Sequence, residues 1–157
     1  AIYMRYKEGF KGLPVSMNPY DPNVCEPNFW LSGLLLDPDA MCKQVRGESK
    51  ALYVSEPGKS CPTEILEAIA AINAEGRPIW KPMHMQPIYR MNAFVTREGN
   101  GRAKTNSYIS GCATGTDGLP LDIGADIFHR GLCLPSDNKM TSEQQDVIIE
   151  VIRRCFE

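Results

Sequence analysis

The segment from Trp80 to Gln86 gathers the side chains best suited to binding a ligand. It carries Lys81, His84 and Gln86 around two prolines, and a proline disfavours helix at the residue before it. We therefore expect a rigid, exposed peptide whose aromatic surface, cation and hydrogen-bonding groups suit a polar or phosphorylated small molecule. The alternative is that Trp80 belongs to the core, Lys81 is solvated and His84 caps a turn. Spacing alone does not separate these two interpretations.

Other catalytic patterns are missing from the sequence. It contains no Gly-x-Ser-x-Gly, no His-Glu-x-x-His, no Walker lysine and no calcium-binding loop. The string GNGRAK at residues 99–104 resembles a phosphate-binding turn only superficially, since it lacks a third glycine and a strand-to-helix frame. We interpret it as a flexible loop tip. We expect His129 to be a surface helix residue and Arg130 to form a structural salt bridge.

The cysteine pattern argues against a metal centre. The six cysteines are widely spaced, form no Cys-x-x-Cys pair and are accompanied by only two histidines. A zinc site needs such ligands at short, regular spacing, so we predict no metal site. A core of this size needs no disulfides for stability, so we expect reduced thiols in a cytoplasmic protein.

Length and charge limit the class of protein. The 157 residues predict one domain spanning 1–157, and the formal net charge of -2 argues against a protein built mainly to hold nucleic acid or an anionic membrane. No apolar run approaches the roughly 18 residues that span a bilayer. We expect neither a nucleic-acid nor a membrane partner.

The first half of the chain must supply the elements that position the polar segment. Ile2, Tyr3, Tyr6 and Phe10 recur at helical spacing, so we expect the chain to open partway through an amphipathic helix. A proline-rich extended connection over residues 11–27 follows. Further predicted elements are a buried strand over residues 28–37 and a short strand over residues 51–54.

The second half contains two strong helical patterns. One begins with an early-turn proline at Pro62 and ends at Gly76, and the other begins with a capping box formed by Thr141 and Gln144. Between them we predict an extended return at 77–80, a long loop at 96–118, a short helix at 126–129 and a strand at 131–134. These elements predict an α+β fold in which helices pack on one face of a small, largely antiparallel sheet.

Three stretches carry a resemblance to a known family. They are NFWL at residues 28–31, RPIWKPMHMQP at 77–87, and FHRGLCLPS at 128–136 followed by MTSEQQ at 140–145. In this order they closely resemble the C-terminal part of the DegT/DnrJ/StrS family of pyridoxal-phosphate-dependent nucleotide-sugar aminotransferases. Within the family they look most like members that act on UDP-linked 4-keto-6-deoxy sugars, such as those making bacillosamine precursors. The resemblance weakens across residues 97–124.

The resemblance implies that residues 1–157 form the small domain of a fold-type-I aminotransferase, without its larger N-terminal domain. It implies that the parent enzyme uses pyridoxal phosphate, acts on a keto-sugar nucleotide in cell-surface polysaccharide or glycan synthesis, and is a homodimer. The family's cofactor-binding lysine belongs to the large domain. None of this chain's lysines lies in a matching context, so no cofactor is expected in this chain.

The resemblance also assigns roles to the polar segment. It implies that His84 and Gln86 face the nucleotide-sugar pocket, and that Trp80, Lys81 and Asn28 line this pocket or the domain junction. For Asn28 and Trp30, a role in the core or at the strand start stays equally open. No residue here is expected to be catalytic, and the isolated chain is expected to be inactive. The alternatives are a non-catalytic nucleotide-sugar-binding or assembly module, and a structural domain without a ligand.

Overall fold

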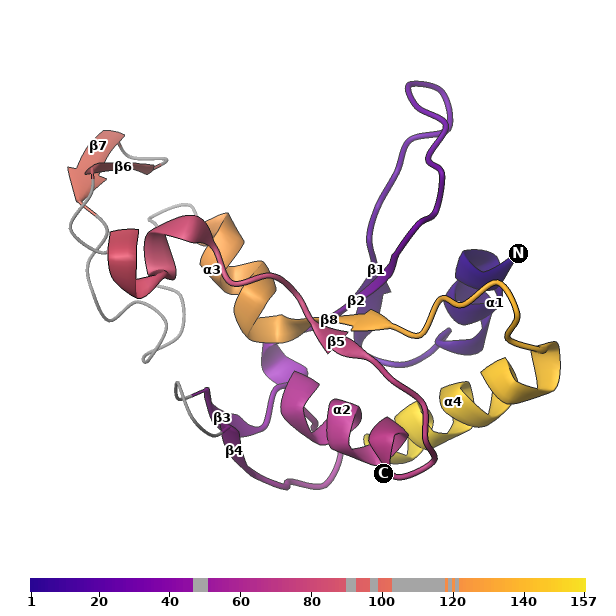
Figure 1. Cartoon of the computed structure of the whole chain (residues 1–157). Helices are drawn as coiled ribbons and strands as arrows, with labels where there is room; N and C mark the ends of the chain where they lie inside the picture. The colour runs from indigo at the N-terminus through magenta and orange to yellow at the C-terminus, as the bar shows by residue number, and fades with distance from the viewer. Residues whose placement is uncertain (47–50, 90–92, 97–98, 103–117, 119, 121) are drawn as a thin grey trace.

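A computed structural model describes residues 1–46, 51–89, 93–96, 99–102, 118, 120 and 122–157 (Figure 1). The helices are α1 (Ile2–Gly9), α2 (Pro62–Ala70), α3 (Ile123–Arg130) and α4 (Ser142–Arg154), and the short 3-10 helices are η1 (Pro38–Ala40), η2 (Met83–Met85) and η3 (Pro87–Tyr89). The strands are β1 (Val15–Met17), β2 (Ser32–Leu36), β3 (Lys43–Arg46), β4 (Ala51–Val54), β5 (Arg77–Pro78), β6 (Ala93–Thr96), β7 (Gly99–Arg102) and β8 (Gly131–Leu134). Among the described helices, none is long and apolar enough to cross a bilayer.

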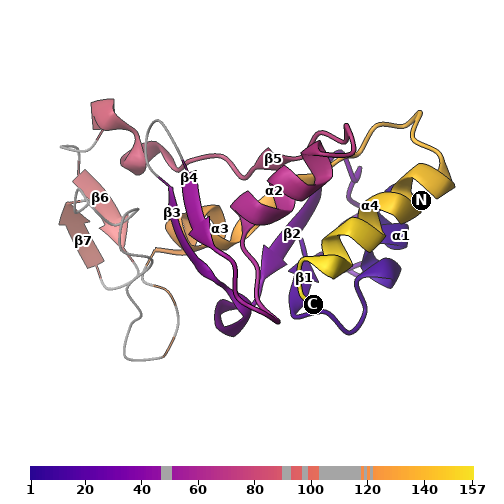
Figure 2. The ribbon, with the colours of Figure 1, turned by 90° about the horizontal axis from the view of Figure 1, so that it is seen from below.

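A four-stranded antiparallel sheet in the order β1-β2-β8-β5 forms the centre of the fold. Seen from below, α1, α2 and α4 lie over one face of this sheet (Figure 2). The connection between β1 and β2 projects from the sheet (Figure 1), and at its base Tyr20 and Phe29 pack against Tyr3 of α1. Two-stranded ribbons, β3-β4 and β6-β7, complete the described strands. The predicted α+β fold with helices on one face of a largely antiparallel sheet is confirmed.

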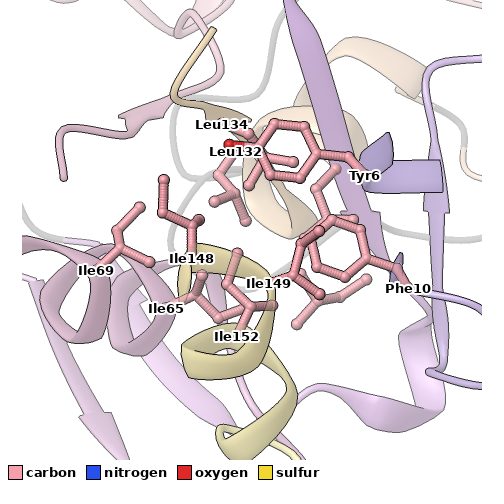
Figure 3. Packing of buried hydrophobic residues seen from close by; sticks show 11 residues of the cluster. Tyr6, Phe10, Ile65, Ile69, Leu132, Leu134, Ile148, Ile149 and Ile152 are labelled. Atoms are coloured by element: carbon pink, nitrogen blue, oxygen red, sulfur yellow. The ribbon is translucent and has the colours of Figure 1, made fainter. Parts of the chain in front are cut away.

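The core lies between the sheet and the three helices (Figure 3). Residues 32, 34 and 36 of β2 are buried while 33 and 35 are half-buried, which is the alternation of a strand with one face on a core. From the helices the core receives Tyr6, Phe10, Ile65, Ile69, Ile148, Ile149 and Ile152. The helical spacing of these apolar residues therefore sets how each helix sits on the sheet.

The last helix begins as the sequence predicts. The Thr141 hydroxyl accepts a hydrogen bond from the backbone N–H of Gln144 (3.2 Å), and the Gln144 side chain accepts one from the backbone N–H of Thr141 (2.9 Å). This capping box satisfies two N–H groups that the first turn leaves unpaired. The predicted helix start at Thr141 is confirmed.

The predicted end of the earlier helix at Gly76 is wrong. Helix α2 ends at Ala70, because Asn73 adopts a left-handed conformation (φ 59°) and the Ala74 N–H returns to the carbonyl oxygen of Ile69 (3.0 Å). This is the hydrogen-bond pattern of a Schellman cap, in which asparagine replaces the usual glycine. Gly76 serves close packing instead, since a Cβ there would lie 2.7 Å from Cδ1 of Ile69.

Two other predictions differ from the structure. The strand predicted over residues 28–37 begins only at Ser32, because Phe29 has a left-handed backbone (φ 51°) that no strand accommodates. The prediction of a loop over residues 96–118 is wrong at its start, because Gly99–Arg102 pairs with Ala93–Thr96 as an antiparallel ribbon. Most of the remaining residues of that predicted loop lie outside the described part of the chain.

Close packing explains the glycine that opens β8. A Cβ at Gly131 would lie 2.5 Å from the carbonyl oxygen of Ile127 and 2.8 Å from Cγ1 of Ile79. We expect Gly131→Ala to lower the free energy of unfolding by about 1–3 kcal/mol, because backbone must move to admit the methyl group. Urea unfolding measures the change. Gly33→Ala is the matched control, since its Cβ would meet nothing nearer than 3.6 Å. Equal stability of the two variants would contradict this explanation.

Candidate functional site

His84 and Asp122 form a half-buried polar pair. Nε2 of His84 lies 2.5 Å from Oδ2 of Asp122, and the two side chains are 13% and 17% exposed. His84 belongs to η2 and Asp122 precedes α3, so the pair joins segments 38 residues apart in the sequence. A carboxylate at this distance fixes the orientation of the imidazole ring and selects which ring nitrogen carries a proton.

Local structure explains why Asp122 lies where it does. It is the N-cap of α3, and its Oδ1 accepts a hydrogen bond from the backbone N–H of Ala125 (2.9 Å). Gly124 leaves room for Pro82, which an added Cβ would approach to 3.4 Å. One carboxylate therefore caps a helix with one oxygen and binds His84 with the other. Any movement of α3 must move His84 as well.

Lys81 and Gln86 close the segment that carries His84. The side-chain amide of Gln86 donates to the carbonyl oxygen of Lys81 (3.3 Å), and Met85 between them is buried. The exposed peptide predicted here is wrong in part, since Lys81, His84 and Gln86 are half-buried and η2 and η3 each form a single 3-10 turn. The three residues thus lie on one compact segment.

Trp80 and Asn28 lie apart from this pair: Trp80 lines a separate cleft, whereas Asn28 is not among the residues that line it. Trp80 is 65% exposed, so the alternative that it belongs to the core is wrong. Its ring lies 6.4 Å from that of Trp30, centroid to centroid. The side chain of Asn28 is exposed and accepts a hydrogen bond from the backbone N–H of Trp30 (3.0 Å), so it shapes the turn that presents Trp30.

Helix α3 is fixed at its other end by arginines. Arg46 donates to the carbonyl oxygen of Phe128 (2.5 Å) and its guanidinium lies 5.0 Å from the centre of the Phe128 ring. Arg130 binds both carboxylate oxygens of Asp126 at 2.8 and 2.5 Å, and it also donates to the carbonyl oxygen of Leu36. The structural salt bridge predicted for Arg130 is confirmed. These contacts hold the helix that carries Asp122.

His129 is half-buried rather than a simple surface residue. Burial, and then the positive charge of Arg46, lower the pKa of His129 below its usual value near 6.5, while Asp126 opposes the shift. The unfolded chain therefore binds a proton that the folded chain resists. The free energy of unfolding is therefore highest above the pKa that His129 has in the unfolded chain. It decreases as the pH falls through that value towards the lower pKa of the folded chain.

We therefore expect His129→Gln to flatten the pH dependence of stability. Between pH 8 and pH 5.5, wild type should lose on the order of 1 kcal/mol more than the variant, because each unit of pKa shift corresponds to about 1.4 kcal/mol. Urea unfolding at the two pH values measures the difference. Equal pH dependence in the two proteins would contradict the shift.

Most of the described cysteines have the properties of buried apolar side chains, whereas Cys25 is exposed. Cys25, Cys42, Cys61, Cys133 and Cys155 are free, whereas Cys112 lies outside the described residues. Burial raises the pKa of Cys42 to about 12 and that of Cys155 to about 11. Such thiols stay protonated at neutral pH, and a protonated thiol is a poor nucleophile and metal ligand. Among the residues with described side chains, no three histidine, cysteine or acidic groups gather at one point.

The residues that the structure describes do not by themselves fit pyridoxal phosphate. That cofactor needs a lysine in an enclosed pocket together with an acidic group and phosphate ligands. Of the described lysines, four are exposed and two, Lys59 and Lys81, are half-buried. Lys59 pairs with Glu56, and Lys11, one of the exposed ones, pairs with Glu8. We therefore assign no step of a reaction to the cofactor on this chain.

Sequence reasoning missed Asp122 and undervalued Trp30. An aspartate before the string IGAD is an N-cap signal, but the short helix was predicted to begin at residue 126, so Asp122 fell outside it. No sequence signal pairs Asp122 with His84. Trp30 was assigned to the core or the strand start, yet it is 72% exposed.

Comparison with known proteins finds similarity to aminotransferases in part of the sequence and in the fold. No family model matches the chain. It is 33% identical over 95 residues to a Bacillus subtilis (strain 168) protein named "Putative pyridoxal phosphate-dependent aminotransferase EpsN"; the match covers 60% of this chain and 19% of EpsN. The chain therefore spans about a fifth of the length of this curated relative.

Solved structures share the fold at lower identity. "Putative sugar aminotransferase Spr1654 from Streptococcus pneumoniae", in its PMP form, matches 98% of this chain and 29% of its own, with a TM-score of 0.61 and 16% identity. A DegT DnrJ EryC1 StrS aminotransferase from Brucella abortus matches 99% and 29%, with a TM-score of 0.54 and 18% identity. The fold is thus found within sugar aminotransferases, over less than a third of their length.

Proposed function

We propose that this chain is the substrate-side part of a pyridoxal-phosphate-dependent aminotransferase that transfers an amino group to a keto-sugar nucleotide. The main support is the match to EpsN together with a fold found in solved sugar aminotransferases. Within that fold, His84 and Gln86 are the residues expected to face the nucleotide sugar, and Lys81, Trp80 and Asn28 are expected to line its pocket or the domain junction. The UDP-4-keto-6-deoxy-sugar subgroup, a homodimeric parent, a cytoplasmic location and a role in polysaccharide synthesis belong to the same proposal.

The chain's own residues have limited tasks in this proposal. Pyridoxal phosphate supplies the amino-group chemistry and is held by the part of the enzyme outside this chain. His84, oriented by Asp122, offers a hydrogen bond to a sugar hydroxyl or phosphate oxygen, and the ammonium of Lys81 favours a nearby anion. These groups bind and orient the substrate. Without the cofactor-binding part, the isolated chain would not transfer amino groups.

The test replaces His84 in the complete enzyme. We expect His84→Ala to lower kcat/KM for a keto-sugar nucleotide by at least about tenfold, which corresponds to about 1.4 kcal/mol of lost binding in the transition state. The control is His129→Gln at the chain's other histidine, which faces Arg46 rather than the polar segment. Kinetics unchanged by His84→Ala would remove His84 from the site.

A non-catalytic nucleotide-sugar-binding or assembly module is the second candidate. The observation that favours it is that the described lysines do not form a cofactor pocket. The two candidates differ in the gene sequence upstream of the codon for Ile2, which either encodes a cofactor-binding domain or does not. A domain with a suitable lysine there supports the enzyme, and its absence supports the binding module.

A further inference from the structure

Two exposed indole rings meet at one edge of the central sheet. Trp30 lies just before β2 and Trp80 just after β5, and they are the only tryptophans in the chain. Their ring centroids are 6.4 Å apart with an interplanar angle of 42°, and the residues are 72% and 65% exposed. Large aromatic side chains gain free energy by leaving water, so a cluster of them on a surface marks a binding site.

The indoles line a cleft of about 650 Å³. Pro78, Cys133 and Leu134 contribute apolar surface to it. Polar groups also line the cleft: Arg77 is paired with Glu75 at 2.5 Å, and the hydroxyl of Ser136 donates to the carbonyl oxygen of Leu134 (3.1 Å). Aromatic walls combined with a few donors and acceptors suit a flat, polar heterocycle.

The position of Trp80 connects this cleft with the polar segment. Lys81 follows directly, and His84 is four residues further along. At about 3 Å per residue, four residues span at most about 12 Å. A nucleoside diphosphate sugar has a flat base at one end and a sugar at the other, with phosphates between them. A ligand with its base stacked on the exposed face of one of the indoles could extend its phosphates and sugar towards Lys81 and His84.

We propose that Trp30 and Trp80 bind the base of the nucleotide sugar by stacking. This assignment rests on the proposed function, because it takes the nucleotide sugar as the ligand, and it names the part of the chain that recognises the nucleotide. Stacking on aromatic side chains accepts any base, since every base has a π-face. The guanidinium of Arg77 has further N–H donors besides the one that binds Glu75, and the Ser136 oxygen can accept a hydrogen bond, so these two groups can bind the edge of the base.

The two tryptophans make the test direct, because all indole fluorescence of the chain comes from this cleft. The 157-residue chain is titrated with uridine monophosphate, and its folding is checked by circular dichroism. We expect saturable quenching with a dissociation constant in the millimolar range, as befits a single stacked ring. Ribose 5-phosphate and inorganic phosphate should not quench. Quenching by these two compounds to the same extent would overturn recognition of the base.

Variants of the two tryptophans locate the site, and their binding is measured by a method that does not depend on tryptophan fluorescence. Saturation-transfer NMR on the base protons of uridine monophosphate should show at least about tenfold weaker binding for Trp80→Ala and for Trp30→Ala. Trp80→Phe, which keeps an aromatic ring, should retain more binding than Trp80→Ala. Leu52→Ala is the control, since Leu52 is 56% exposed on the β3-β4 ribbon, away from the cleft.

The outcomes separate this assignment from the proposed function. A folded chain that shows no saturable binding, or that binds equally well after Trp30→Ala and Trp80→Ala, overturns the assignment of the base to the cleft. If His84→Ala still lowers turnover of the complete enzyme, the proposed function survives that result. Binding of the base that depends on both tryptophans supports the cleft, even where the complete protein turns over no keto-sugar nucleotide.

Discussion

Replacing Arg130 with methionine should lower the free energy of unfolding by about 3–5 kcal/mol, because it leaves a mostly buried carboxylate without its partner. Asp126 and Arg130 each have side chains only 13% exposed and share two hydrogen bonds. The substitution also removes the donor to the carbonyl oxygen of Leu36, at the end of β2. Urea unfolding measures the loss, which for a domain of this size corresponds to a fall in Tm of about 6–20 °C.

Two controls separate burial from the presence of an ion pair. Arg154 and Glu150 form a pair with the same four-residue spacing at 3.1 Å, but their side chains are 66% and 56% exposed. Arg154→Met should therefore change stability by less than about 1 kcal/mol. The double variant Arg130→Met/Asp126→Leu should recover most of the loss, since no unpaired charge then remains. Similar losses for Arg130→Met and Arg154→Met would contradict the argument.

Elements whose determinants are local were predictable from the sequence. The capping box of Thr141 and Gln144 and the apolar stripe after it specify α4 from residues within a few turns. The strand at 131–134 could be predicted equally well, because a short apolar run that ends at a proline is typical of a buried strand. The end of α2 was not, since either Asn73 or Gly76 could have supplied the C-cap. Only the packing of Gly76 against Ile69 distinguishes them.

The candidate site was only half predictable. The sequence marked the segment holding Lys81, His84 and Gln86, because two prolines and a cluster of polar groups are adjacent in the chain. It could not predict that His84 binds Asp122, since a hydrogen bond between two segments far apart in the chain produces no recognisable spacing of residues in the sequence. Nor could it decide whether Trp80 is core or surface, which depends on the neighbours that the fold supplies.

The two roles of Asp122 can be separated by two substitutions. Asp122→Ala removes both the N-cap of α3 and the acceptor for His84, and we expect it to lower the free energy of unfolding by about 2–4 kcal/mol. Asp122→Asn keeps an oxygen for the backbone N–H of Ala125 and places an amide against Nε2 of His84. We expect this second variant to lose less than about 1.5 kcal/mol, since only the contact with His84 changes.

The asparagine variant then shows whether the carboxylate positions His84 for the substrate. An amide that donates to Nε2 requires that nitrogen to be the acceptor, so the proton of the neutral ring moves to Nδ1. Nitrogen-detected NMR of the imidazole should show this exchange of tautomers in Asp122→Asn. If the carboxylate acts through the orientation and proton of His84, turnover of the complete enzyme should fall in Asp122→Asn as in His84→Ala, although the fold is retained. An unchanged tautomer together with unchanged turnover would limit Asp122 to capping the helix.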